Sequence, residues 1–395
     1  MRFLIVALLA AATAGAQTRV ETARVEGLLR RAVVLDLHCD TTLVIAAEGY
    51  DLAERHAYAQ VDIPRMREGG VTGVFFSIWT SPRLLSPPQS VRQALYQIDE
   101  VRREVRRHRE AMVLARTAEE VLAARKQGRI VALLGVEGGH MIDSDLAVLR
   151  SFHELGARYL TLTHGRNTPW ADSSGDKPAH NGLTGFGRQV VREMNRLGMM
   201  VDISHVADKT FYDALETSTA PLIASHSSCR ALADHARNMT DEMMRALARK
   251  GGVIHINYYS GFLDQEFEKR YQALKEDNQR EQQIDLEYRS DPRRRSQEQR
   301  KLNAARLAKL GRPPFSRLLD HFLHAVKVAG VDHVGLGSDF DGVSDLLPEG
   351  MEDISKIPNL VRGLMERGLS DQDIEKILGG NTLRVMRAVE QAAGK

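Results

Sequence analysis

The chain contains the segment Val33-Val34-Leu35-Asp36-Leu37-His38-Cys39-Asp40, an apolar run that ends in polar residues and recurs in kind along the sequence. Comparable runs span Val71 to Trp79, Ile130 to Gly138, Arg158 to His164, Met199 to His205, Pro221 to Ser227, Gly251 to Tyr258 and His333 to Asp339. Strands that alternate with helices imply parallel βαβ units, since a parallel neighbour needs a crossover, and eight units close a barrel. The pattern predicts an α/β protein whose residues 17–395 form one (β/α)8 TIM barrel.

The stretches between the runs predict helices. Helical spacing of apolar residues occurs in Val91 to Ala115 and in Thr184 to Leu197. Four glycines lie where helix C-caps are expected, namely Gly128, Gly156, Gly198 and Gly251. The runs themselves are continuously apolar, as strands covered on both faces are.

One segment, Asp264 to Pro314, breaks this rhythm between the seventh and eighth runs. It is rich in Glu, Gln, Lys and Arg and includes Arg293-Arg294-Arg295. We expect a charged helical insertion before the eighth strand. Two interpretations are open: a surface insertion without a chemical role, and a lid or homodimer contact over the barrel mouth.

Composition excludes several classes of protein. Of the 395 residues 43% are hydrophobic and 27% are charged, which suits a globular protein with a sizeable core. Lysine and arginine number 54 against 52 for aspartate and glutamate, so a net charge of +2 gives no reason to expect nucleic acid or an anionic membrane as partner. The two cysteines, Cys39 and Cys229, are too few for a four-cysteine zinc site, and whether they pair is open. Any metal would be bound through nitrogen and oxygen.

Residues 1–16 have the features of a secretory signal peptide. Arg2 precedes an apolar run from Phe3 to Ala12, and Ala14-Gly15-Ala16 has the small residues that a signal peptidase needs. The apolar run is shorter than the roughly 20 residues that span a bilayer. We therefore expect an exported protein, periplasmic or secreted, without a stable membrane anchor.

Polar residues accumulate at the predicted strand ends, where the active site of a (β/α)8 barrel lies. His38 and Asp40 are two residues apart in a strand, so both side chains are expected to point into the barrel mouth. Glu137 ends the third run, and the two glycines after it leave room for a ligand. The fifth, sixth and eighth runs end with His205, His226 and Asp339.

Each of these histidines alone has a simpler explanation, a hydrogen bond within a loop. Three histidines, two aspartates and one glutamate at one rim are different, because carboxylates gathered so closely are stable mainly when cations neutralise them. We predict a site for two divalent ions. Ligands of nitrogen and oxygen without thiolate suit zinc, with manganese and iron as alternatives, and Glu137 can bridge two ions.

A series of motifs extends this pattern from about Val33 to Arg384. They are His38-Cys39-Asp40, Val136-Glu137-Gly138-Gly139-His140, Leu162-Thr163-His164, Asn167-Thr168-Pro169-Trp170-Ala171-Asp172-Ser173, Asp202-Ile203-Ser204-His205, Ser225-His226-Ser227, Arg237-Asn238, Gly335-Leu336-Gly337-Ser338-Asp339-Phe340-Asp341-Gly342 and Gly379-Gly380-Asn381. In content and order they resemble the membrane (renal) dipeptidase family, which are zinc dipeptidases of the amidohydrolase superfamily. The resemblance implies a metal-dependent hydrolase, and it assigns one zinc ion to His38 and Asp40, a second to His205 and His226, and the bridging position to Glu137.

The resemblance also implies that His164, Arg237 and Asp339 contact the substrate. The planar fork of Arg237 matches a carboxylate, as recognition of a dipeptide's free C-terminus requires. Asp339 beside a metal-bridging hydroxide can take its proton and return it to the leaving amine, and His164 with a zinc ion can stabilise the oxyanion. The expected catalytic residues are thus Asp339 and Glu137. A surface ion pair of Arg237 and an internal hydrogen bond of His164 are the alternatives.

The expected substrate is a small dipeptide, including those with a D-residue at the C-terminal position. Cys39 stands where the family often has Asn, and Leu43 stands near a position that is aromatic in the family, so the side-chain preference is open. Cys39 itself is either redox-sensitive or a small buried filler. Lactonase, phosphotriesterase or deaminase activity on the same metals is an alternative that Arg237 opposes. A metal-dependent binding or scaffold protein is another, which Asp339 opposes.

Overall fold

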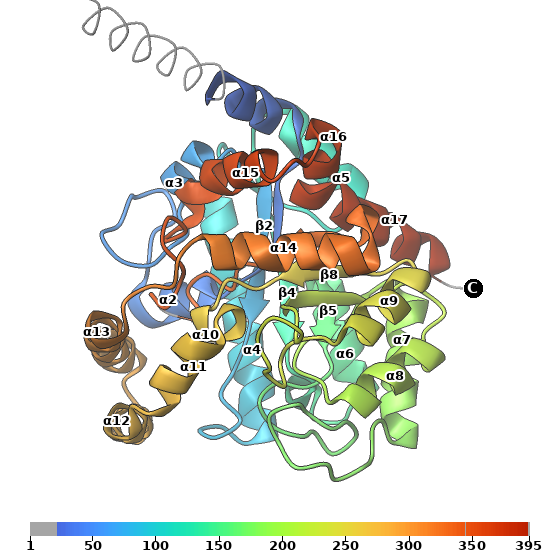
Figure 1. Cartoon of the computed structure of the whole chain (residues 1–395). Helices are drawn as coiled ribbons and strands as arrows, with labels where there is room; N and C mark the ends of the chain where they lie inside the picture. Colours follow the sequence, from blue (N-terminus) through green and yellow to red (C-terminus); the bar gives the residue numbers. More distant parts are fainter. Residues whose placement is uncertain (1–21, 344, 394–395) are drawn as a thin grey trace, which may run out of the picture.

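A closed ring of parallel strands forms the centre of the computed structural model, which describes residues 22–343 and 345–393 (Figure 1). In spatial order the strands are β1 (Leu35–Cys39), β2 (Gly73–Ile78), β4 (Ile130–Glu137), β5 (Ala157–Thr161), β6 (Met200–Asp202), β7 (Ile223–Ser227), β8 (Val253–Ile256) and β9 (Val334–Leu336). Pairing of β2 with β4 and of β9 with β1 closes the ring. The eight predicted runs are these eight strands, so the (β/α)8 fold is confirmed. The predicted signal peptide, residues 1–16, lies outside the described residues.

A ninth strand, β3 (Met112–Leu114), lies outside the ring and pairs with residues 130–132 of β4. The prediction of one helical stretch from Val91 to Ala115 is therefore wrong at its end, because helix α4 (Pro87–Arg107) stops before β3. The physical reason is the length of β4. Strand β5 pairs with β4 only from Leu134 onward, so β3 satisfies the backbone of the early part of β4.

Helices surround the ring on its outer side (Figure 1). Besides α4 they are α2 (Thr41–Glu48), α3 (Ile63–Glu68), α5 (Ala118–Lys126), α6 (Leu146–Leu155), α7 (Gly185–Leu197), α8 (Asp208–Thr217), α9 (Asp241–Arg249), α14 (Ser316–Ala329), α15 (Ile357–Glu366), α16 (Asp371–Glu375) and α17 (Asn381–Ala392). Short 3-10 segments cover Gly139–Ile142, Val331–His333 and Ile354–Lys356, and a π-helical turn covers Lys376–Gly380. The predicted helix from Thr184 to Leu197 is α7, and Thr184 caps it by accepting a hydrogen bond from the backbone N–H of Gly187.

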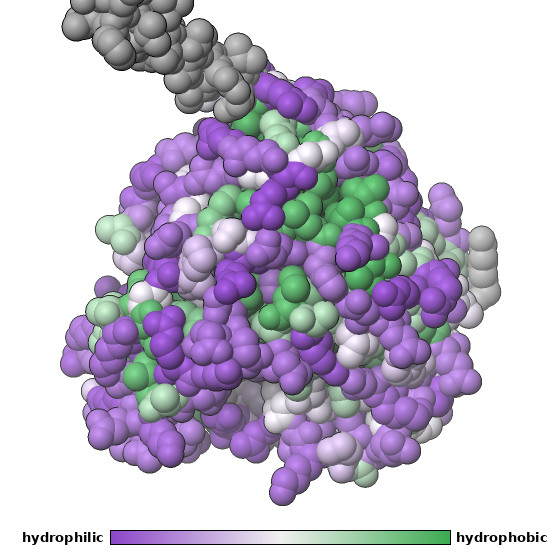
Figure 2. Space-filling model, in the orientation of Figure 1, coloured by the Kyte–Doolittle hydropathy of each residue, from purple (hydrophilic) through white to green (hydrophobic). Residues whose placement is uncertain are grey.

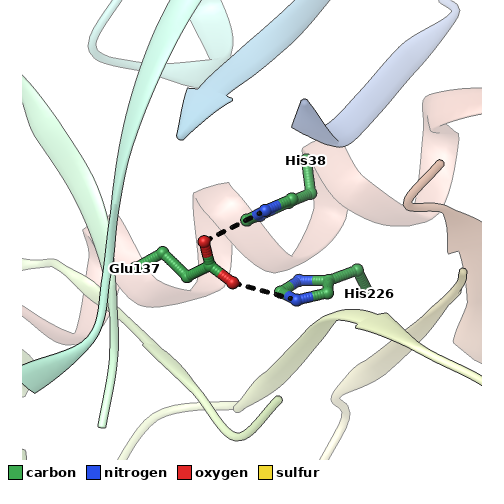
Figure 3. A group of neighbouring side chains, drawn as sticks. All are labelled: His38, Glu137 and His226. Atoms are coloured by element: carbon green, nitrogen blue, oxygen red, sulfur yellow. Dashed lines mark ion pairs between the residues drawn. The ribbon is translucent and has the colours of Figure 1, made fainter. Parts of the chain in front are cut away.

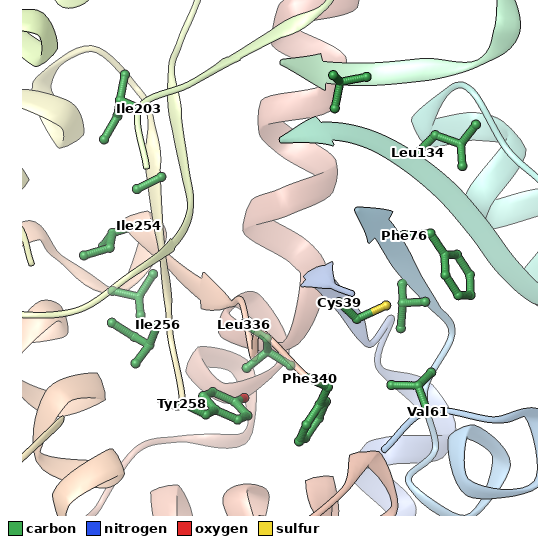
Figure 4. Close-up of a cluster of buried hydrophobic side chains, with 14 of the residues drawn as sticks. Cys39, Val61, Phe76, Leu134, Ile203, Ile254, Ile256, Tyr258, Leu336 and Phe340 are labelled. Carbon is green, nitrogen blue, oxygen red and sulfur yellow. The ribbon is translucent and has the colours of Figure 1, made fainter. Parts of the chain in front are cut away.

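Two apolar layers hold the strands. A cluster with residues from seven of the ring strands, among them Phe75, Leu133 and Ile223, fills the inside of the ring, and Met386 of α17 packs with it. The larger cluster packs the strands against the helices (Figure 4). Beyond these layers, a cluster of buried polar side chains gathers at the carboxyl ends of the strands, which is where the site lies.

Cys39 belongs to the larger apolar cluster, is fully buried, and does not pair with Cys229 (Figure 4). Burial raises the pKa of the Cys39 thiol well above its usual range. A neutral thiol among apolar neighbours fits the interpretation of Cys39 as a small filler.

The segment from Asp264 to Pro314 is helical, as predicted, and follows α10 (Ser260–Leu263). It consists of α11 (Gln265–Gln272), α12 (Lys275–Glu287) and α13 (Pro292–Leu310). Helices α12 and α13 extend away from the ring, and their surface in the view of Figure 2 is mostly hydrophilic (Figures 1 and 2). An ion pair between Arg300 and Glu48 connects α13 to α2, the helix that begins directly after β1 and Asp40. Among the helices of the described residues, none combines the length and the apolar character needed to cross a bilayer.

Candidate metal centre and substrate site

All the predicted site residues lie at the carboxyl ends of ring strands or in the loops that follow them. His38 lies in β1 and Asp40 just after it, Glu137 ends β4, His164 follows β5, His205 follows β6, His226 lies in β7, Arg237 lies between β7 and α9, and Asp339 follows β9. Parallel strands of a closed ring end on one side, so these side chains converge although the sequence separates them by up to about 300 residues.

Glu137 is the centre of the cluster. Its Oε1 atom lies 2.9 Å from Nε2 of His205 and 3.3 Å from Nε2 of His226. Its Oε2 atom lies 3.6 Å from Nε2 of His38 and accepts a hydrogen bond of 3.1 Å from the Ser77 hydroxyl. Figure 3 shows the imidazoles of His38 and His226, each approaching a different oxygen of this carboxylate. The two oxygens of one carboxylate therefore face different imidazoles, as those of a bridging ligand would.

The second group gathers around His38. Its Nε2 atom lies 3.3 Å from Oδ2 of Asp40 and 3.9 Å from Oδ1 of Asp339. Gly342 allows this approach, because a Cβ atom there would lie 2.2 Å from Oδ2 of Asp40 and 2.3 Å from Oδ1 of Asp339. The backbone leaves just enough room for both carboxylates.

The donor set fits divalent cations. Nε2 of His38 is buried and has no hydrogen-bond partner in the described part of the chain, although carboxylates surround it. Three overlapping groups each bring their ligand atoms within 4.8 Å of one another: His38, Glu137 and His226; Glu137, His164 and His205; and His38, Asp40 and Asp339. Imidazole and carboxylate donors without a thiolate suit zinc, manganese or iron.

The charges in the cluster influence one another strongly. Burial favours the neutral form of Glu137, but four surrounding imidazoles outweigh it and hold the pKa of this carboxyl well below its usual range. Burial and the neighbouring carboxylates of Asp40 and Glu137 raise the pKa of Asp339 well above its usual range, against the effect of His38. Burial also holds the pKa values of His205 and His226 well below normal, so both rings are neutral, as metal ligands are.

The backbone is strained at two of these positions. His205 has a φ of 66° and Asp339 a φ of 64°, in the left-handed region that residues other than glycine rarely adopt. Such conformations cost about 1–3 kcal/mol each and persist where the surroundings fix them. The loops after β6 and β9 thus hold an imidazole and a carboxylate of the cluster in place at some expense of stability.

Several supporting residues were not predicted from the sequence. The Tyr159 hydroxyl lies 2.8 Å from Nδ1 of His38. The Ser225 hydroxyl lies 2.7 Å from Nδ1 of His226 and 2.7 Å from Oδ2 of Asp202. These contacts fix the ring orientations and leave both Nε2 atoms directed at the cluster. Asp202 belongs to one of the sequence motifs and Tyr159 lies in a predicted strand. The sequence does not reveal the pairing register of neighbouring strands, which brings both residues close to the histidines.

His164 and Arg237 border the cluster. Nε2 of His164 lies 3.6 Å from Oε1 of Glu137, and its ring packs between Trp79 and His205. Arg237 is half-buried and forms no ion pair with the described residues. Its Nη2 atom donates a 3.0 Å hydrogen bond to the backbone oxygen of His226. Burial lowers the pKa of Arg237 to about 10, so the guanidinium stays charged at neutral pH.

Asp339 and Asp341 have different surroundings. Oδ2 of Asp339 accepts a 2.9 Å hydrogen bond from the side-chain amide of Asn257, and its other oxygen faces His38. Asp341 accepts hydrogen bonds from the Thr41 hydroxyl at 2.6 Å and from the backbone N–H of Gln60 at 2.8 Å. Asp341 therefore fixes the loops, whereas Asp339 has an oxygen directed at the cluster.

Comparison with known proteins gives a consistent result. The family model described as membrane dipeptidase (peptidase family M19) matches residues 22–395. An uncharacterized dipeptidase of Schizosaccharomyces pombe is 35% identical over 391 residues, covering 94% of this chain and 83% of that protein. Dipeptidase tcpJ of Claviceps purpurea is 35% identical over 341 residues, covering 84% of this chain and 70% of that protein.

Solved structures share the fold. The probable dipeptidase PvdM of Pseudomonas aeruginosa superposes with a TM-score of 0.81 at 25% identity, covering 95% of this chain and 100% of that one. A metallo peptidase of Rhodobacter sphaeroides, liganded with a phosphinate mimic of the dipeptide L-Ala-D-Ala, has a TM-score of 0.75 at 26% identity, with 91% and 99% covered.

Proposed function

The chain belongs to the membrane dipeptidase family, peptidase family M19, and from that premise we propose that it is an exported dipeptidase with two zinc ions. The family identifies it as a metal-dependent hydrolase of dipeptides. Beyond the family's activity, we propose the number and identity of the ions, the roles of the site residues, the stereochemistry of the substrate and the export of the protein. The observation that carries it is the position of Glu137 between two groups of donors.

His38 and Asp40 would hold one ion, His205 and His226 the other, and Glu137 would contact both. Bound divalent ions activate a water molecule and polarise the scissile carbonyl group. The protein's part is to fix these donors, which the hydrogen bonds of Tyr159 and Ser225 to the two rings do.

Asp339 is the proposed proton carrier. One of its oxygens faces His38, while Asn257 holds the other at 2.9 Å. From this position the carboxylate takes a proton from the attacking water and returns it to the departing amine. His164, whose Nε2 atom lies 3.6 Å from Oε1 of Glu137, would donate a hydrogen bond to the oxygen that becomes negatively charged.

Arg237 is the proposed binding group for the C-terminal carboxylate of the dipeptide. Its guanidinium is fixed on one side by the backbone oxygen of His226 and has no ionic partner among the described residues. A fork with unused donors matches a planar carboxylate with two hydrogen bonds. The phosphinate mimic of L-Ala-D-Ala in the related R. sphaeroides enzyme supports the further proposal that a D-residue is accepted next to this carboxylate.

The test combines metal analysis with a substrate screen. Purified active protein should contain two zinc ions per chain and should hydrolyse both L,L- and L,D-dipeptides. Arg237→Met should raise KM for dipeptides strongly, and an unchanged KM together with turnover of lactones or phosphotriesters would favour another hydrolase activity. Export predicts that the mature protein begins after residue 16, which mass spectrometry of the protein from culture fractions determines.

A further inference from the structure

The loop that carries Arg237 is held by the root of the insertion, where α10 and α11 begin. The side-chain amide of Asn238 donates a 2.9 Å hydrogen bond to the backbone oxygen of Phe262. The backbone N–H of Asp234 donates a 2.6 Å hydrogen bond to the side-chain oxygen of Gln265. The loop is thus fixed on both sides of Arg237, at Asp234 and at Asn238, to one segment that follows β8.

Phe262 also contacts Arg237 directly. The guanidinium carbon of Arg237 lies 5.3 Å from the centre of the Phe262 ring, within the range of a cation–π contact. The Phe262 ring is held by His235, at 4.7 Å between ring centres, and by Tyr259, edge-on at 4.8 Å. The ring is therefore a fixed surface against which the guanidinium rests.

The other contacts of Arg237 are with uncharged groups. Nη2 bonds the backbone oxygen of His226, Nη1 lies 3.4 Å from the Ser227 hydroxyl, and Nε is buried without a partner among the described residues. An acidic side chain in this place would fix the arginine but would compete with a substrate carboxylate for the same N–H groups. An aromatic face stabilises the positive charge and leaves the N–H groups at the edge of the plane free.

We propose that Phe262 is a positioning residue for Arg237, so that the root of the insertion takes part in recognising the substrate carboxylate. The inference rests on the proposed role of Arg237 and gives a role to α10, which directly precedes the insertion of residues 264–314. The effect acts on binding of the carboxylate and leaves the proton transfer at Asp339 unchanged.

The experiment compares Phe262→Leu and Phe262→Tyr with the full-length wild-type enzyme. Each is assayed with a dipeptide and with the C-terminal amide of the same dipeptide, as substrate or as competitive inhibitor. Loss of one desolvated cation–π contact corresponds to a roughly 3- to 30-fold weaker binding. Phe262→Leu should raise KM for the free dipeptide by such a factor with kcat nearly unchanged. The amide should bind both enzymes alike, and Phe262→Tyr, which keeps the ring, should restore KM.

Phe267→Leu is the matched control, because Phe267 lies in α11 with Arg270 over its ring at 5.9 Å and belongs to a separate apolar cluster. It should leave KM unchanged. Equal losses for the free dipeptide and its amide, or equal effects of Phe262→Leu and Phe267→Leu, would overturn the inference. Arg237→Met is assayed in parallel. If neither Arg237→Met nor Phe262→Leu changes KM, the proposed role of Arg237 and with it the proposed function fail. If Arg237→Met raises KM and Phe262→Leu does not, only the role of Phe262 fails.

Discussion

His205 and His226 direct their Nε2 atoms toward each other at a distance of 2.8 Å. Both atoms also lie within 3.3 Å of the same oxygen of Glu137. When both rings are neutral, the Nε2–H of one ring can donate a hydrogen bond to the Nε2 lone pair of the other. A cation bound to both Nε2 atoms and to Glu137 would replace this hydrogen bond with metal–ligand bonds, so we expect metal binding to stabilise the site.

Removal of metal should therefore destabilise the fold as well as abolish hydrolysis. A metal present at one hundred times its Kd stabilises the native state by about 2.7 kcal/mol. We expect chelation to lower the melting temperature by several degrees and zinc to restore both the melting temperature and the activity. Calorimetry with and without chelator measures this. His205→Asn should lower the metal content by one ion per chain, and a chelated protein with unchanged melting behaviour would contradict the assignment.

Asp339→Asn should retain metal but lose turnover, because an amide cannot accept the proton of the attacking water. General acid–base catalysis typically contributes about 100- to 10,000-fold, and kcat should fall by such a factor. The control is Asp341→Asn, which removes a carboxylate that fixes Thr41 and Gln60. This variant should lower the melting temperature more than kcat. Near-normal kcat in Asp339→Asn would show that another group moves the proton.

The positions of all eight ring strands could be predicted from the sequence, because buried parallel strands form continuous apolar runs. Strand β3 was missed because its three residues pair with β4 only where β5 does not reach, which no local pattern records. The convergence of the cluster residues could be predicted because burying charged or imidazole side chains at apolar strand ends costs free energy unless a partner compensates it. The role of Phe262 could not be predicted from the sequence, because it depends on a contact between α10 and a loop residue 25 positions earlier in the chain.

Tyr159→Phe tests the contacts that orient the proposed metal ligands. Tyr159 approaches His38 at 2.8 Å, and this is possible only because Gly135 has no side chain: a Cβ atom there would lie 1.9 Å from the tyrosine ring. Loss of such an outer partner typically costs about 10- to 100-fold in metal affinity or activity. Competition with a chelator should show the weaker metal binding of Tyr159→Phe.

Tyr258→Phe is the matched control for that measurement. The Tyr258 hydroxyl is buried and has no hydrogen-bond partner among the described residues, and its ring packs edge-on against Phe340. Removing this hydroxyl should leave metal affinity unchanged and keep or raise stability, since an unsatisfied polar group disappears. If both variants lose metal to the same extent, the hydroxyl of Tyr159 has no specific role.

His255 should make the fold sensitive to acid. The ring is fully buried, with Nδ1 2.9 Å from the backbone oxygen of Ala224 and Nε2 3.1 Å from the Thr382 hydroxyl. Burial lowers the pKa of His255 from 6.5 to about 3, against the effect of the Ala224 oxygen. Between these values the unfolded chain binds a proton that the folded chain does not. Stability is therefore highest above pH 6.5 and falls as the pH decreases, by up to about 1.4 kcal/mol per pH unit for this one group.

The matching variant is His255→Gln, which cannot titrate. Its free energy of unfolding should be lower at neutral pH, because the new side chain fits the space less well, but should fall less steeply between pH 6 and pH 4. Urea titrations of both proteins at each pH, after removal of metal, isolate the slope from the release of metal in acid. Parallel curves for the two proteins would mean that His255 is protonated in the folded state or that other buried histidines dominate the acid sensitivity.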